Sequence, residues 1–403
     1  MRFTTIEALL RKQPRIDELM RRLASSAAMV PVDISLVSGA YPWLIADAAA
    51  QRPILVVTAT TREAEELVAA LRQLIAPAAV AEFPSWETLP HERLSPSQDT
   101  VGRRVQILRH LAHPEDFDEP LRVVVAPIRA VVQPLVTGIG DVPEIIARTD
   151  DQLERDELVS RLVAGAYTRT DLVEKRGQFA VRGGIVDVFP PTNEHPLRIE
   201  FFGDVVEEVR AFAVADQRSL ELRPEGLVAP ACRELLLTER VRAKAAALIP
   251  THPSLAPMLE SLAEGIPVDG MEALASVLAD GMELLTDVMP AETAVIVCDS
   301  ERVRSRAHDV AATSQEFLEV SWQTASIGSG RRSIWGVVRI EAGRTSADMR
   351  FPRTCPGGSC LHSSQMRKPR TATWMTSRRL PMSSPCRCRR PPNFKDAYKK
   401  QSS

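Results

Sequence analysis

The first third of the chain alternates short apolar runs with a segment of helical periodicity. Four apolar runs predict buried strands: Ile34–Val37, Ile54–Val57, Val80–Phe83 and Val123–Ala126. Residues 61–75 repeat apolar positions at helical spacing, with early acidic residues and with Thr61 as the expected N-cap. Strand, helix and strand in this order predict a doubly wound α/β domain, in which helices cover both faces of a parallel sheet.

The pattern changes after Asp150. A helical segment over residues 151–163 precedes two pairs of strand-like runs, each joined by a turn dipeptide: Gln178–Arg182 and Ile185–Phe189 through Gly183-Gly184, and Leu197–Phe202 and Val205–Val214 through Gly203-Asp204. These hairpins predict a small antiparallel α+β domain. It is inserted before α/β character resumes at residues 293–298, beyond a mostly helical stretch over residues 238–285.

Charge divides the chain further. Residues 322–403 carry 17 Lys and Arg against 3 Asp and Glu, whereas residues 1–321 carry 33 basic and 49 acidic residues. The last part also loses amphipathic periodicity, so we expect a disordered basic low-complexity tail. The expected division is 1–127 for the first part of the α/β domain, 128–215 for the inserted domain, 216–321 for the return to the first domain, and 322–403 for the tail.

Composition bounds the class of protein. No run reaches the roughly 18 apolar residues that a bilayer span requires, and charged residues interrupt the first 22 positions, so neither a membrane partner nor a signal peptide is expected. Only two of the 6 cysteines, Cys232 and Cys298, precede residue 350, which argues against a disulfide framework in the body of the chain. A cytoplasmic protein is expected.

The turn after the first predicted strand is the place to look for a nucleotide site. It contains Ser38 and Gly39, followed by Tyr41-Pro42-Trp43. A P-loop needs a further glycine and then Lys and Ser or Thr, which hold the phosphates and magnesium, and no lysine occurs between positions 13 and 174. The pattern favours a degenerate nucleotide turn, with no catalytic residue and no bound cofactor.

Several longer segments carry a resemblance. Phe83-Pro-Ser-Trp-Glu-Thr-Leu-Pro and the residues that follow to Asp99, Gly177–Pro190, Arg198–Asp204 and Asp216–Leu220 occur in this order. Together they resemble the N-terminal region of bacterial transcription-repair coupling factors (Mfd) and share their pattern with the excision-repair protein UvrB. The resemblance implies a RecA-like/UvrB-like domain that has lost its ATP site, and an inserted domain that docks on UvrA.

The resemblance ends near residue 321. The chain contains neither Gly-Lys-Ser/Thr nor an Asp-Glu-x-His/Gln run, so we expect RNA polymerase and DNA to be partners only of domains missing from this chain. A truncated or frameshifted product is the expected origin of the tail. The function that the resemblance implies is an adaptor that recruits UvrA to RNA polymerase stalled at DNA damage, during nucleotide excision repair.

The resemblance also implies a docking site. Arg169, Arg176 and Arg182 match arginine positions of the UvrB docking domain, and the three could converge on one face of the hairpin sheet. Ala180 stands where UvrB has a further arginine. Guanidinium groups suit bidentate pairing with carboxylates of a partner. The alternative is that these arginines are solvated surface charges.

Two other interpretations stay open. The Ser38-Gly39 turn could belong to an ATPase, and the basic tail could bind nucleic acid nonspecifically through phosphate neutralisation. Four tail cysteines, Cys355, Cys360, Cys386 and Cys388, lack the two-residue spacing of zinc knuckles, so no metal site is expected. His91 lies in a Pro-rich connection that we expect to be structural.

Overall fold

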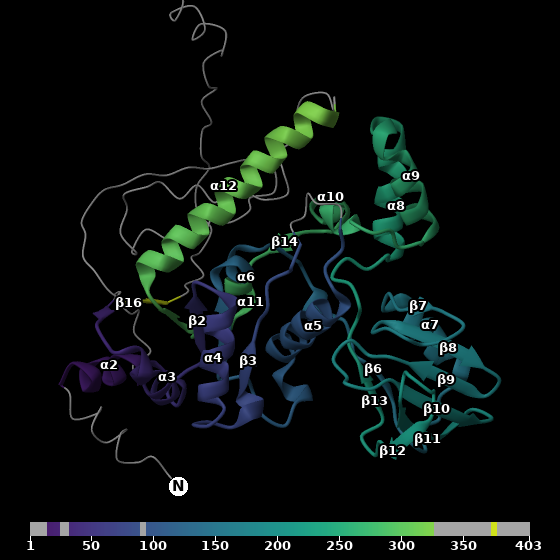
Figure 1. The fold of residues 1–403 in the computed structure, drawn as a ribbon, viewed down its shortest axis with the longest axis horizontal. Coiled ribbons are helices and arrows are strands. Elements are labelled where there is room, and N and C mark those ends of the chain that lie inside the picture. The colour runs from purple at the N-terminus through teal and green to yellow at the C-terminus, as the bar shows by residue number, and fades with distance from the viewer. Residues whose placement is uncertain (1–13, 25–31, 89–93, 326–371, 377–403) are drawn as a thin grey trace, which may run out of the picture.

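The computed structural model describes residues 14–24, 32–88, 94–325 and 372–376, with side chains described in these ranges except at residues 15, 314–325 and 372–376. The largest sheet has the strand order β1-β16-β15-β2-β4-β3 (Figure 1). Its strands are β1 Asp33–Ile34, β16 Ala372–Thr376, β15 Ala294–Val297, β2 Ile54–Thr58, β4 Val123–Pro127 and β3 Val80–Glu82. Strands β15, β2, β4 and β3 are parallel, and β16 is antiparallel to both of its neighbours.

Helices cover both faces of this sheet. Side chains alternate across a strand, so Ile54 and Val56 of β2 pack on one face while Leu55 and Val57 pack on the other. The first face is covered by α2 Pro14–Ala24, α3 Tyr41–Ala49 and α4 Thr61–Leu71. The second is covered by α5 Gln98–Ala112, α6 Ile128–Val132, α11 Leu285–Val288 and α12 Ser300–Ala325. The predicted α/β class with a parallel sheet is therefore confirmed.

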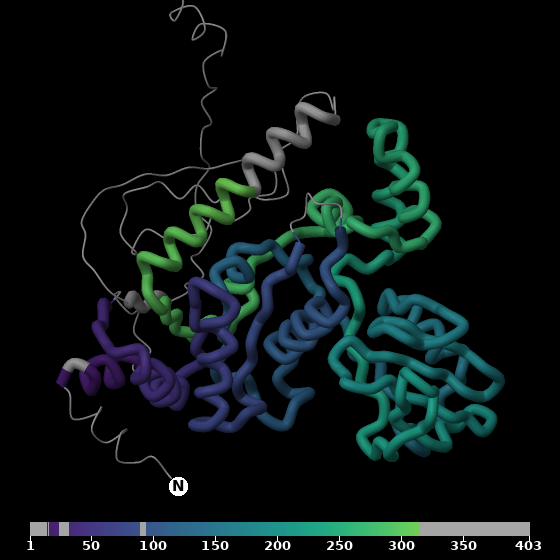
Figure 2. Tube along the Cα trace, viewed as in Figure 1, coloured from purple at the N-terminus to yellow at the C-terminus, as the bar shows by residue number. Residues whose placement is uncertain are grey.

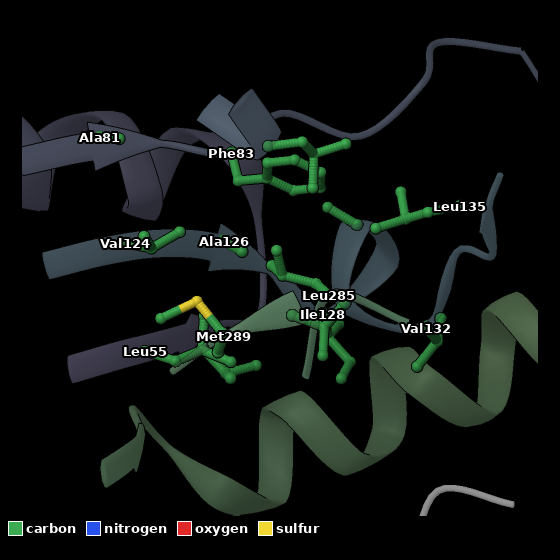
Figure 3. Packing of buried hydrophobic residues seen from close by; sticks show 14 of the residues in the cluster. Leu55, Ala81, Phe83, Val124, Ala126, Ile128, Val132, Leu135, Leu285 and Met289 are labelled. Atoms are coloured by element: carbon green, nitrogen blue, oxygen red, sulfur yellow. The ribbon is translucent and has the colours of Figure 1, made fainter. Parts of the chain in front are cut away.

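The core on the second face continues past residue 127. Figure 3 shows Phe83, which directly follows β3, and Val124 of β4 in one cluster with Ile128 and Val132 of α6 and with Leu135, and all of these side chains are buried. Residues 128–135 thus share their core with the α/β domain. Strands β2 and β4 form where the sequence predicts them because continuous Val- and Ile-rich runs suit a sheet that is buried on both faces.

Two details of this domain differ from expectation. The N-cap of α4 is Thr60 and not Thr61: the Thr60 hydroxyl accepts from the Glu63 backbone N–H, and the Glu63 carboxylate accepts from the Thr60 N–H, which makes a capping box. Strand β1 ends at Ile34, three residues earlier than predicted.

The tail also differs from expectation where it is described. Residues 322–325 continue α12, and residues 372–376 form β16, which pairs with β15 along Ala294–Val297. The sequence Ala-Thr-Trp-Met-Thr has three residues of high strand propensity, and pairing it with β15 covers an edge that would otherwise expose unpaired backbone groups. Disorder is therefore wrong for these segments, and the rest of the predicted tail lies outside the described residues.

The second unit is an antiparallel sheet with the order β12-β11-β10-β9-β8-β7 (Figure 1). Its strands are β7 Thr168–Arg169, β8 Gln178–Arg182, β9 Ile185–Val188, β10 Leu197–Phe202, β11 Val205–Phe212 and β12 Ser219–Leu222. Only the β7–β8 pair is parallel. Helix α7 Arg155–Ala164 packs on one face, and the short pair β6 Ile145–Ala147 and β13 Leu227–Ala229 joins the same core. The two predicted hairpins are present.

A small helical unit follows in the chain. It consists of α8 Glu239–Leu248, α9 Ala256–Glu264 and α10 Ala275–Leu278, which share a core of their own. Figure 2 shows α8 and α9 at the upper right, away from the parallel sheet. The pair β14 Met282–Glu283 and β5 Leu135–Val136 links the chain back to the α/β domain. Short 3-10 turns complete the fold at residues 38–40, 77–79, 114–116, 139–141, 249–251, 253–255 and 271–274.

Within the described part of the chain, no helix combines the length and the apolar character that crossing a membrane requires.

Candidate protein-docking site

The two faces of the antiparallel sheet have different roles. Phe179, Val186 and Ile199 lie on the face that packs against α7 and are completely buried. On the opposite face, the Arg198 guanidinium donates to both carboxylate oxygens of Asp187, at 2.8 and 2.9 Å, and lies 4.8 Å from the centre of the Phe212 ring. The hydrogen bond to Asp187 raises the pKa of Arg198. This pair holds neighbouring strands together and is not free to bind a partner.

Arg169 lies at the open edge of the sheet. It is the last residue of β7, which is the edge strand, and its side chain is exposed. No hydrogen bond or ion pair engages its guanidinium among the described residues. An edge position of this kind leaves the full donor set of an arginine available to an incoming carboxylate.

Arg182 lies at the end of β8, beside the β8–β9 turn. Its Nη2 donates to the Asp171 carbonyl oxygen at 2.5 Å, in the segment that follows Arg169. The next residue, Gly183, has a φ of +60° and is exposed, and its carbonyl oxygen accepts from Arg155 Nη1 at 2.8 Å. Arg182 therefore keeps further donors free at this turn, whereas Arg155 also donates from Nε and Nη2 to the Asp156 carboxylate, at 3.0 and 2.7 Å.

Arg176 has different surroundings. Its Nε donates to the Asn193 carbonyl oxygen at 3.1 Å and lies 3.6 Å from a carboxylate oxygen of Asp99, which belongs to α5 of the α/β domain. Its guanidinium also lies 5.4 Å from the centre of the Phe189 ring. This arginine faces the neighbouring domain.

The three predicted arginines do not share one set of contacts. In the strand register Arg169 is paired with Phe179, and Arg182 lies three positions further along β8, so alternation places the two on opposite faces. Arg182 reaches back to Asp171, which brings it to the segment just after Arg169. Arg169 and Arg182 thus flank one edge of the sheet, whereas Arg176 lies against α5. Their role in binding stays a prediction.

The Ser38-Gly39 turn lies at the carboxyl edge of the parallel sheet. Because β16 is antiparallel to both β1 and β15, β1 runs in the same direction as β15. Ser38 and Gly39 are exposed in a 3-10 turn that leads into α3, with Pro42 in the first turn of that helix. A Cβ placed on Gly39 would meet no atom within 4 Å, so nothing at this turn requires a glycine.

Two titratable groups near the start of α3, Tyr41 and Cys298, have raised pKa values. Burial, together with the carboxylates of Glu63 and Asp299, raises the pKa of the Cys298 thiol to about 12. Burial also raises the pKa of Tyr41, with smaller contributions from Cys298 and Asp299. Burial is the main cause of both shifts, and the Glu63 and Asp299 carboxylates are themselves paired with Arg302. The absence of ATP hydrolysis stays a prediction.

Sequence reasoning missed a buried polar cluster between the domains. Arg104 of α5 is fully buried, and its Nε donates to Glu234 Oε1 at 2.6 Å. The same oxygen accepts from Trp86 Nε1 at 2.9 Å. A charged residue in the apolar face of α5 and an isolated tryptophan between two prolines were the available signals, but neither reveals its partner more than 100 positions away.

The residue before Glu234, Arg233, makes a second pair that is partly buried. Arg233 Nη1 donates to Glu272 Oε1 at 2.6 Å, and Ser95 Oγ donates to the other oxygen of the same carboxylate at 2.7 Å. Glu234 therefore contacts the α/β domain, and Arg233, the residue before it, contacts Glu272 beside the helical unit. His91 and the cysteines at 355, 360, 386 and 388 lie outside the described residues.

Comparison with known proteins defines the class. Residues 145–233 match the UvrB interaction domain family, and this range runs from β6 through β13 and contains the whole antiparallel sheet. The UvrABC system protein B of Thermobifida fusca is 32% identical over 210 residues, which cover 48% of this chain and 29% of that protein. The protein thus carries a UvrB interaction domain beside its α/β domain.

A larger similarity identifies the relatives. The transcription-repair-coupling factor of Mycobacterium tuberculosis is 50% identical over 330 residues, covering 78% of this chain and 26% of that protein. The factor of Myxococcus xanthus is 34% identical over 293 residues, covering 68% and 24%. Over most of its length the chain is a homologue of transcription-repair-coupling factors, as the sequence motifs predict, and it spans about a quarter of the length of these relatives.

Proposed function

We propose that this chain is the N-terminal adaptor module of a transcription-repair coupling factor and that it recruits UvrA. The observation that carries the proposal is the match of residues 145–233 to the UvrB interaction domain, which coincides with the antiparallel sheet. This sheet presents Arg169 and Arg182 at its β7–β8 edge. Recruitment would serve nucleotide excision repair at RNA polymerase stalled by DNA damage.

The geometry of the edge fits a partner surface that carries carboxylates. Arginine forks form two parallel hydrogen bonds with a carboxylate and are enriched among the residues that dominate interface energies. Arg169 is exposed without a described partner, and Arg182 is held in place by one backbone carbonyl while its other donors stay free. Arg182 is thus held in a fixed orientation, and both arginines have donors available for a partner.

The α/β domain acts in this proposal as a scaffold. We propose that it is a RecA-like/UvrB-like domain whose nucleotide turn at Ser38-Gly39 has lost its function, because the turn lacks the P-loop residues. In this proposal, contacts with RNA polymerase and DNA lie outside the α/β domain and the antiparallel sheet. The expected location is the cytoplasm, where these partners occur.

Substitution of the edge arginines tests the proposal. Arg182→Ala and Arg169→Ala should each weaken binding to purified UvrA by roughly 10- to 150-fold, the effect of losing a charge-assisted hydrogen bond. Arg218→Ala is the control, because Arg218 is also an exposed arginine of this domain but lies in the β11–β12 connection, where it is 84% exposed and paired with Asp216. Unchanged affinity in the double variant of Arg169 and Arg182, with an unchanged melting curve, would place the docking surface elsewhere.

A further inference from the structure

The first turn of α5 contacts the UvrB interaction domain along one helix face. Gln98 and Gly102 are four positions apart and therefore lie above one another on the helix, with Asp99 beside them. Each of the three approaches a loop of the interaction domain: Gln98 meets Gly177, Asp99 meets Arg176, and Gly102 meets Pro191.

Two of these approaches are closer than a side chain on the glycine would allow without a shift of its neighbour. A Cβ on Gly177 would lie 2.1 Å from Gln98 Oε1, and a Cβ on Gly102 would lie 2.3 Å from the Cβ of Pro191. Gly177 also has a φ of +77°, which only glycine adopts without strain. The two domains are therefore in close contact along this strip, formed by Gln98, Asp99 and Gly102 of α5. Each of the two closest contacts has a glycine on one side.

Arg176 is the charged residue of the interaction domain that meets this strip. It bonds the Asn193 carbonyl oxygen within its own domain, lies against the Phe189 ring, and places its Nε 3.6 Å from the Asp99 carboxylate of α5. Asp99 is shared, because Arg103 Nη2 lies 3.2 Å from its other oxygen. The guanidinium of Arg176 thus connects three segments: the loop before β8, the loop after β9, and α5.

We propose that Arg176 is a positioning residue: it holds the UvrB interaction domain against α5 and supports partner binding through Asp99 instead of touching the partner. The inference rests on the proposed docking of UvrA at the Arg169–Arg182 edge. It separates the three arginines into two roles, with Arg169 and Arg182 facing the partner and Arg176 facing the neighbouring domain. Asp99, an acidic residue outside the domain, then contributes to binding.

The role of Asp99 distinguishes this proposal from direct contact. If Arg176 acts through Asp99, Asp99→Asn should weaken UvrA binding as much as Arg176→Ala does, by about 2- to 5-fold for a half-exposed pair, and the double variant should be no weaker than either single variant. If Arg176 instead binds a carboxylate of UvrA, Asp99→Asn should leave the affinity unchanged or increase it, because it removes a competing acid. That result would overturn the proposal.

Hydrogen exchange of the chain without UvrA gives an independent readout. Arg176→Ala and Asp99→Asn should both accelerate exchange in peptides covering residues 97–103 and 189–194, whereas Arg182→Ala should not. Unchanged exchange in both variants would contradict the positioning role. If the edge variants fail to alter UvrA binding while exchange changes as expected, the docking proposal fails and the positioning contact stands, so the two failures are distinguishable.

Discussion

At the scale of single residues, the buried pair Arg104–Glu234 is the most demanding feature of the molecule. Both side chains are buried almost completely, at 0% and 1% exposure. Arg104 Nη1 donates to the carbonyl oxygen of Pro84 and to Gln133 Oε1, while Nη2 and Glu234 Oε2 have no described partner. The pair is thus well oriented, but two of its polar atoms lack a hydrogen-bond partner among the described residues. Each charge is therefore compensated mainly by the other.

Removing one member of this pair should destabilise the protein strongly. Glu234→Ala should lower the free energy of unfolding by about 3 to 5 kcal/mol, because it leaves a buried guanidinium without its counter-charge. Replacing both members, by Arg104→Met with Glu234→Leu, should recover a large part of that loss. Denaturant titration measures each variant, and an exposed pair gives the control: Arg62→Ala, opposite Glu66, should cost at most about 1 kcal/mol. Equal effects at the two pairs would contradict the account.

At the scale of elements, α4 shows how local chemistry sets a boundary. Thr60 has extended backbone angles, with φ at −133° and ψ at 157°, and its hydroxyl accepts from the N–H of Glu63. Thr61 is already helical and has no such bond. Two adjacent threonines are equivalent to sequence reasoning, which is why the N-cap was predicted one residue too late.

The two threonines provide a matched test. Thr60→Ala should lower the stability by about 1 kcal/mol, since the capping bond is lost, while Thr61→Ala should be close to neutral or slightly stabilising, because alanine is the better helix former. Thermal or denaturant unfolding of the two variants gives the comparison directly. A larger loss from Thr61→Ala than from Thr60→Ala would mean that the capping box does not set the start of the helix.

Elements differed in how far the sequence could predict them. Strands β2, β4, β8 and β9 were predicted within a residue or so, because apolar runs and Gly-Gly turns are local signals. Strand β16 was missed because its place in the sheet depends on an edge formed by β15, about 75 residues earlier. Arg176 was grouped with Arg169 and Arg182 because spacing along a hairpin says nothing about a neighbouring helix such as α5.

At the scale of the whole molecule, the exit from the UvrB interaction domain connects three units. Arg233 pairs with Glu272 next to the helical unit, and the next residue, Glu234, pairs with Arg104 of the α/β domain. The interaction domain is thus held in two places: by the contacts of its loops with α5, and by Arg233 and Glu234 at its C-terminal end. The β7–β8 edge that carries Arg169 and Arg182 lies at the far side of the sheet from β12.

The central claim is that this sheet docks on UvrA in the manner of the related domain of UvrB, and competition tests it most directly. Purified chain should displace labelled UvrB from UvrA in a concentration-dependent way, because both proteins would use the same UvrA surface. The variant with Arg169→Ala and Arg182→Ala should displace it only at roughly 10-fold higher concentration or more. The chain binding UvrA without displacing UvrB, or failing to bind UvrA while folded, would contradict the account.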